Sequence, residues 1–127
     1  MLRFFDYVYY RTCIFYEKSG EKKSYRISAL VLLSALHVLN LFFLFQLIFT
    51  FLNYLPNINK YIAIIPYAAF LILNGVRYNK LNYDVLRERW ANEDVKSYQK
   101  KGVGVVLYML LSAVIVVVLI IIKANNR

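Results

Sequence analysis

Three long apolar runs separated by basic segments constrain the fold of this chain more than any other feature. The runs are Ile27–Leu52, Tyr61–Val76 and Val103–Ile122, and His37 is their one ionisable side chain apart from tyrosine. As helices rising ~1.5 Å per residue, the first would be ~39 Å long and the third ~30 Å, against a hydrocarbon slab of ~30 Å. A soluble helix keeps a charged face towards water, and these runs keep none. We therefore expect an all-α, polytopic integral membrane protein with three transmembrane helices.

Composition favours one membrane-embedded domain over residues 1–127. Hydrophobic residues make up 61% of the chain, whereas soluble domains are ~45–50% apolar even when glycine is counted. The flanks that remain are too short for a separate soluble domain. A single cysteine and a single histidine exclude an internal disulfide framework and a Cys- or His-based metal cluster. We expect no metal or cofactor, and we interpret Cys13 as a small apolar residue.

The placement of basic residues predicts the orientation. Thirteen of the sixteen Lys and Arg residues precede the first run or lie between the second and third, and three lie in the other two segments. Basic residues close to membrane spans are retained in the cytoplasm. The N-terminus and the long loop are thus predicted to be cytoplasmic, and the C-terminus extracytoplasmic.

The second run is short for a span, at ~24 Å as a helix, and it carries Pro66. A re-entrant segment would put the basic loop on the wrong side, so we predict a span that extends past Val76 or crosses a locally thinned bilayer. The segment 53–60, with Pro56 flanked by asparagines, predicts a tight extracytoplasmic turn.

Two further helices are predicted outside the spans. In residues 2–18 an apolar face lies opposite a charged one, typical of an interfacial helix; the faces are Phe4, Phe5, Val8, Tyr9, Phe15 and Tyr16 against Arg3, Asp6, Arg11, Glu17 and Lys18. We favour a membrane-surface anchor over a docking helix for a partner. Residues 77–101 contain no proline or glycine and predict one cytoplasmic helix, either separate from the second span or continuous with it.

The basic residues near the membrane predict contact with anionic lipid headgroups. They are Arg3, Arg11, Lys18, Lys22, Lys23, Arg26, Lys100 and Lys101. The chain has no signature of a nucleic-acid-binding module, so no nucleic-acid partner is expected in spite of the net charge of +9.

Polar side chains inside a span are expensive and mark candidate functional positions. Ser34, His37 and Asn40 recur every three residues on one face of the first span, and Gln46 and Thr50 lie on another face nearer its outer end. We favour a polar clamp to another span or subunit. A pore lining or a proton path through His37 is the alternative.

The segments 6–11 (DYVYYR) and 15–18 (FYEK), followed by Ser28–Asn40, make the first 40 residues similar to small, uncharacterised membrane proteins of Bacteroidota. The resemblance implies a bacterial inner-membrane location and no particular activity.

The chain has no carboxylate pair, nucleophile with a base, or phosphate-binding loop close to a span, so we do not expect an enzyme. The leading hypothesis is a non-catalytic subunit or assembly partner of an inner-membrane complex, in contact with another membrane protein or with copies of itself. The alternative is a homo-oligomeric pore or membrane-permeabilising effector lined by the polar residues of the first span.

Overall fold

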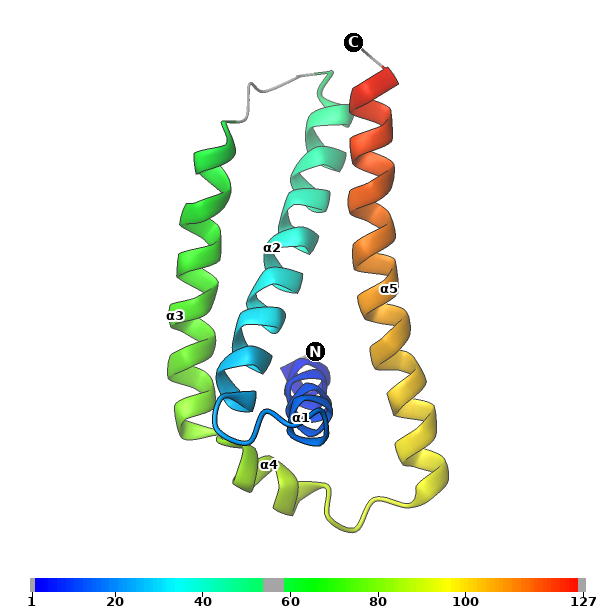
Figure 1. Ribbon diagram of the computed structural model, residues 1–127. Helices are drawn as coiled ribbons and strands as arrows, with labels where there is room; N and C mark the ends of the chain where they lie inside the picture. Colours follow the sequence, from blue (N-terminus) through cyan, green and yellow to red (C-terminus); the bar gives the residue numbers. More distant parts are fainter. Residues whose placement is uncertain (1, 54–58, 126–127) are drawn as a thin grey trace.

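The computed structural model describes residues 2–53 and 59–125, and every regular element within these ranges is helical (Figure 1). The predicted all-α fold is confirmed. The turn predicted around Pro56 lies mostly outside the described residues. In chain order the elements are α1 (Leu2–Lys18), α2 (Tyr25–Phe51), the 3₁₀ turn η1 (Lys60–Ala63), α3 (Ile64–Lys80), α4 (Tyr83–Arg89) and α5 (Val95–Asn125).

Three long helices form one layer, in which α2 stands between α3 and α5 and packs on both (Figure 1). The helix α1, seen end-on in Figure 1, lies across the lower part of this layer and contacts α2, α4 and α5. The short α4 lies below α1 and leads towards the start of α5. The lower end is therefore the only part of the described structure in which more than one layer of helices packs together.

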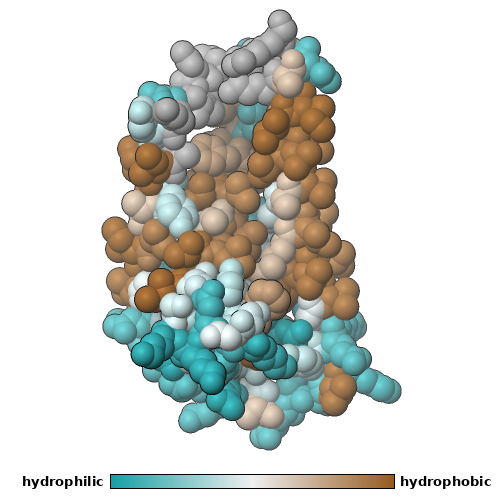
Figure 2. Space-filling view, in the orientation of Figure 1, coloured by the Kyte–Doolittle hydropathy of each residue, from teal (hydrophilic) through white to brown (hydrophobic). Residues whose placement is uncertain are grey.

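Two helices, α2 and the Val95–Ile122 part of α5, are long and apolar enough to cross a membrane. The helix α3 has 17 residues, or ~26 Å as an ideal helix, which is shorter than a typical span. Figure 2 shows a belt of apolar residues above the lower end of the molecule, called the apolar belt, and polar residues gathered at that lower end, called the polar end. That α3, the second of the three apolar runs, also crosses the membrane remains a prediction.

The helix α1 is in the centre of the hydrophobic core and is not a separate surface helix. Val8 and Cys13 are fully buried, and Tyr9 is 1% exposed. The core is completed by residues from the four other α-helices, which are Ala29, Leu33, Tyr78, Tyr83, Leu86 and Val105. Protein therefore covers the side of α1 that we predicted would face the membrane surface.

The bounds of α1 agree with the prediction, but its assignment to two faces is wrong. Tyr7 and Tyr10, which the predicted apolar face omitted, are 5% and 7% exposed, whereas Phe15 on that face is 63% exposed. Four consecutive large apolar residues, Tyr7 to Tyr10, cover slightly more than one helical turn. Their side chains therefore point in all directions around the axis, and α2, α4 and α5 bury them from several sides.

The single helix predicted at 77–101 is also wrong, because this segment belongs to three helices. Asn82 caps α4, its side-chain oxygen accepting a hydrogen bond from the Val85 amide at 3.1 Å. Asp94 precedes α5 and accepts a hydrogen bond from the Ser97 amide. Asparagine and aspartate at these positions satisfy amides that a helix start leaves unpaired, so each one begins a new helix.

Gly102 and Gly104 lie inside α5, so the helix begins well before the apolar run Val103–Ile122. A glycine inside a helix costs only ~1 kcal/mol relative to alanine. Good helix formers before the glycines (Gln99 to Lys101) and beyond the valines that follow them (Met109 to Leu111) outweigh that cost, so α5 continues from the polar end into the apolar belt without interruption.

Candidate functional site

A buried carboxylate joins three helices at the polar end. Asp6 of α1 is 2% exposed and accepts two short hydrogen bonds from the Arg77 guanidinium of α3, both at 2.8 Å from Nη2. The Tyr78 hydroxyl donates to the same carboxylate at 3.1 Å, and Arg89 Nη1 lies 3.8 Å from it. We call these four residues the Asp6 cluster. A charge this deeply buried needs such partners to offset its desolvation.

Sequence reasoning missed the Asp6 cluster. We placed Asp6 on a solvated face and counted Arg77 as a loop cation. The two residues are 71 positions apart in the chain, and no local periodicity links them. A usable signal was the run of apolar residues directly after Asp6, because a carboxylate next to a fully apolar turn is buried together with it.

A second polar contact ties α1 to the start of α5. The Tyr7 hydroxyl donates to Glu93 at 3.1 Å, and Lys101 Nζ pairs with the same carboxylate at 3.0 Å. Burial, reinforced by Glu93, raises the pKa of Tyr7 to about 12. The hydroxyl therefore stays protonated and acts as a hydrogen-bond donor at physiological pH, which suits a structural contact.

Two of the predicted intramembrane residues, Ser34 and His37, meet Asn74 of α3. Ser34 is fully buried, and Asn74 Nδ2 lies 3.0 Å from its hydroxyl oxygen and 3.2 Å from His37 Nδ1. Because an amide nitrogen only donates, Nδ1 is the acceptor and the imidazole proton is on Nε2. The rings of Phe5 and Phe70 pack on His37. Asn74 thus links α3 to α2.

The third predicted residue of that face, Asn40, links α2 to α5. Its Nδ2 donates to the Tyr108 hydroxyl, and its Oδ1 accepts from the Ser112 hydroxyl at 3.2 Å. Ser112 also donates to the Tyr108 carbonyl at 2.9 Å. The face of Ser34, His37 and Asn40 together with Asn74, Tyr108 and Ser112 is called the polar clamp below. It fastens α2 to the helices on both of its sides.

The other two predicted residues do not join the polar clamp. The Thr50 hydroxyl donates to the Gln46 carbonyl of its own helix at 2.7 Å. The Gln46 side chain is half-buried in a phenylalanine-rich stretch and makes no hydrogen bond within the part of the chain that the structure describes. Gln46 is therefore the carboxamide of α2 that still needs a partner.

The predicted headgroup-binding residues divide into two sets. Arg11, Arg26 and Lys101 have partners in the chain: Arg11 stacks 3.6 Å from the Tyr98 ring centroid, and Arg26 pairs with Asp84 at 2.9 Å. The others are exposed and form no ion pair within residues 2–53 and 59–125, namely Arg3, Lys18, Lys22, Lys23 and Lys100.

Cys13 is fully buried, and burial raises the pKa of its thiol to about 12. It is protonated at physiological pH and packs as a small apolar side chain. Within the described residues, no three His, Cys, Asp or Glu side chains are grouped closely enough to hold a metal ion.

Comparison of the chain with protein-family models, curated proteins and solved structures gave no match. The functional argument therefore depends on the geometry of the polar clamp, Gln46 and the polar end.

Proposed function

We propose that this chain is a three-span protein of the bacterial inner membrane that works as a non-catalytic subunit or assembly partner of a membrane complex. The observation that carries the proposal is the unpartnered Gln46 side chain in α2. All other polar side chains of α2 between Ser34 and Thr50 are hydrogen-bonded within the chain.

The depth of Gln46 follows from its position relative to α5. Asn40 meets Tyr108 and Ser112, and α2 and α5 run in the same direction. Asn40 is therefore about level with residue 110 of α5, which lies midway between Tyr108 and Ser112. Gln46, six residues further along α2, is about level with residue 116, which is ~10 Å along the helix before the next charged residue, Lys123. At that depth water is absent, and a carboxamide gains ~0.6–2 kcal/mol from a hydrogen bond to another helix.

The layer architecture supports a partner at this position. Within the described structure, α2 has α3 and α5 as neighbours, and α1 covers it only near the polar end. A helix from another subunit can therefore reach the outer half of α2 without displacing an existing contact. Thr50, one turn beyond Gln46 on the same face of α2, is exposed and leaves that face open to a partner helix.

The polar end supports the proposed orientation. It gathers residues 2–26 and 77–101, which carry thirteen of the sixteen Lys and Arg residues, on one side of the apolar belt (Figures 1 and 2). By the retention of basic segments in the cytoplasm, this end is cytoplasmic and the end of α5 extracytoplasmic. The short α3 then spans a locally thinned bilayer.

The polar clamp favours this proposal over a pore. A lumen would need Ser34, His37 and Asn40 to face water, but all three bond to α3 or α5. Ion-flux assays in liposomes separate the two: a pore gives a flux that disappears in Asn40→Leu, whereas an assembly subunit gives none.

Replacement of Gln46 tests the assembly role. In native nanodiscs, we expect the wild-type chain to run as a complex and Gln46→Leu to lose about 3- to 30-fold in association, because the interhelical bond of ~0.6–2 kcal/mol is removed. Thr50→Val is the matched control, since its hydroxyl bonds only to its own helix. A wild-type chain that remains a lone monomer at every protein-to-lipid ratio would refute the proposal.

A further inference from the structure

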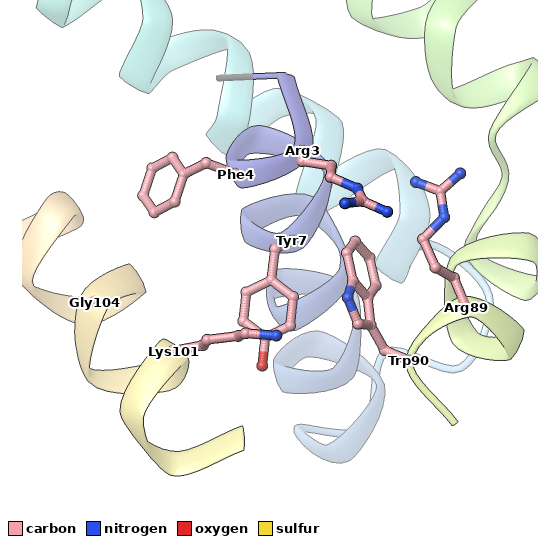
Figure 3. Close-up of a pocket in the computed structure, with 7 residues that line it drawn as sticks. All are labelled: Arg3, Phe4, Tyr7, Arg89, Trp90, Lys101 and Gly104. Atoms are coloured by element: carbon pink, nitrogen blue, oxygen red, sulfur yellow. The ribbon is translucent and has the colours of Figure 1, made fainter. Parts of the chain in front are cut away.

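A pocket of about 540 Å³ opens between α1, α4 and α5 at the polar end (Figure 3). Its charged lining consists of Arg3, Arg89 and Lys101, which come from three different helices. In Figure 3 the guanidinium groups of Arg3 and Arg89 lie on the same side of the pocket, next to the indole of Trp90. The chain thus brings three cations to one cavity.

The carboxylates near the pocket leave positive charge uncompensated. Lys101 pairs with Glu93 at 3.0 Å, but Arg89 reaches Asp6 only at 3.8 Å, and Asp6 already holds Arg77 at 2.8 Å. Arg3 forms no ion pair within the described ranges and is exposed. Two guanidinium groups are therefore available to an anion, and guanidinium binds phosphate through two parallel hydrogen bonds.

The remaining walls are apolar. Phe4, Tyr7 and Trp90 line the pocket, with the Tyr7 and Trp90 rings in edge contact at 5.0 Å. Gly104 forms the wall on α5, and a Cβ built on it would meet nothing within 4 Å. The missing side chain at Gly104 thus leaves an opening next to the exposed apolar surface of α5 that continues along the same face through Leu107 and Leu111.

The pocket lies where charge gives way to apolar sequence. Lys101 is the last charged residue of α5 before Lys123, and the interval of 22 residues is ~33 Å as a helix, close to the thickness of the hydrocarbon slab. In a membrane the cationic rim is thus at the depth of the lipid phosphates, and the Gly104 opening is at the depth of the first acyl carbons.

We infer that this pocket binds one anionic phospholipid, with the headgroup phosphate held by Arg3 and Arg89 and an acyl chain lying along α5 past Gly104. The cations bind a phosphate group, whether it belongs to a lipid or is free inorganic phosphate. The apolar walls and the opening onto α5 favour the lipid over the free anion. The inference rests on the membrane insertion of the proposed function but not on its assembly role.

Trp90 provides a direct probe, because it is the one tryptophan of the chain and lines the pocket. The full chain is placed in phosphatidylcholine nanodiscs that contain increasing amounts of phosphatidylglycerol brominated on its acyl chains, and Trp90 fluorescence is recorded. We expect saturable quenching at a mole fraction about tenfold lower than with brominated phosphatidylcholine, the advantage of one charge-assisted pair.

Two variants locate the binding. Arg3→Gln removes an unpaired cation, and Gly104→Leu fills the opening without changing charge; each is expected to raise the half-quenching mole fraction of phosphatidylglycerol about tenfold, towards that of phosphatidylcholine. Lys96→Gln removes an exposed charge of α5 that does not line the pocket and should leave quenching unchanged. Far-UV circular dichroism and the oligomeric state of each variant show that a loss of binding does not come from a loss of fold or assembly.

Three results would overturn the inference. The first is equal quenching by the two brominated lipids. The second is selective quenching that survives both Arg3→Gln and Gly104→Leu. The third is displacement of the brominated lipid by millimolar inorganic phosphate, which would assign the site to a free anion.

Discussion

At the scale of single residues, Asp6 is the position where one side chain controls several contacts. Its carboxylate accepts from Arg77 and Tyr78 and lies near Arg89, so it joins α1 to α3 and α4. Arg77 Nη2 and Asp6 are 2.8 Å apart, with side-chain exposures of 31% and 3%. This is a partly buried pair in which the carboxylate carries most of the desolvation cost.

We predict that Asp6→Asn lowers the free energy of unfolding by about 2–3 kcal/mol, because it removes the charge that offsets a partly buried guanidinium. Chemical denaturation in mild detergent, followed by circular dichroism, measures the loss. Asp84→Asn is the control, because its pair with Arg26 is exposed on both sides and should contribute less than about 0.5 kcal/mol. Equal effects of the two variants would contradict the central role of Asp6.

At the scale of elements, local patterns predicted where helices form better than what they pack against. The bounds of α1 were predicted, and the helical core of α2 was found because a long apolar run has one regular structure that satisfies its backbone in lipid. The break between α3 and α4 was not predicted, because it depends on Asn82 acting as a cap and not as a solvated helical residue.

The candidate site was predicted on one side only. The face of Ser34, His37 and Asn40 stood out because polar groups are costly in an apolar run. Its partners Asn74 and Tyr108 were not predicted. Which polar residues meet depends on how α3 and α5 pack against α2, and no spacing within one helix carries that information.

Two glycines of α5 make a matched test of helix energetics. Gly104→Ala is expected to raise the unfolding free energy by about 0.5–1 kcal/mol, since alanine favours the helix and its Cβ meets nothing. Gly102→Ala has the same helix preference, but its Cβ would collide with the Arg11 guanidinium and displace it from the Tyr98 ring, 3.6 Å away. Thermal unfolding should therefore rank Gly104→Ala above Gly102→Ala, and the opposite ranking would contradict the packing of Arg11 on α5.

At the scale of the whole molecule, polar and apolar parts are separated along the direction of the long helices (Figure 2). The lower end holds the ion pairs and the aromatic core, and the upper part holds long apolar surfaces with the polar clamp between helices. Folding stability is thus concentrated at one end, and the apolar part offers its surface to lipid and to partner helices.

Cysteine labelling in intact cells tests the orientation. The native Cys13 should not react with a membrane-impermeant maleimide near pH 7.5, because it is buried and its raised pKa, about 12, keeps the thiol protonated well above that pH. Asn125→Cys, exposed at the end of α5, should label from outside, and Lys22→Cys should label only after lysis. The reverse labelling pattern would place the polar end outside the cytoplasm and refute the orientation.

The central position of α1 also has a consequence for synthesis. The helix α1 leaves the ribosome well before some of its partners, since Asp6 pairs with a residue 71 positions later and Tyr7 bonds to one 86 positions later. Until α4 and the start of α5 have been translated, the aromatic side chains of α1 have only α2, α3 and the bilayer surface to contact. For that interval we expect α1 to lie at the bilayer surface, as its sequence predicts, before the finished protein encloses it.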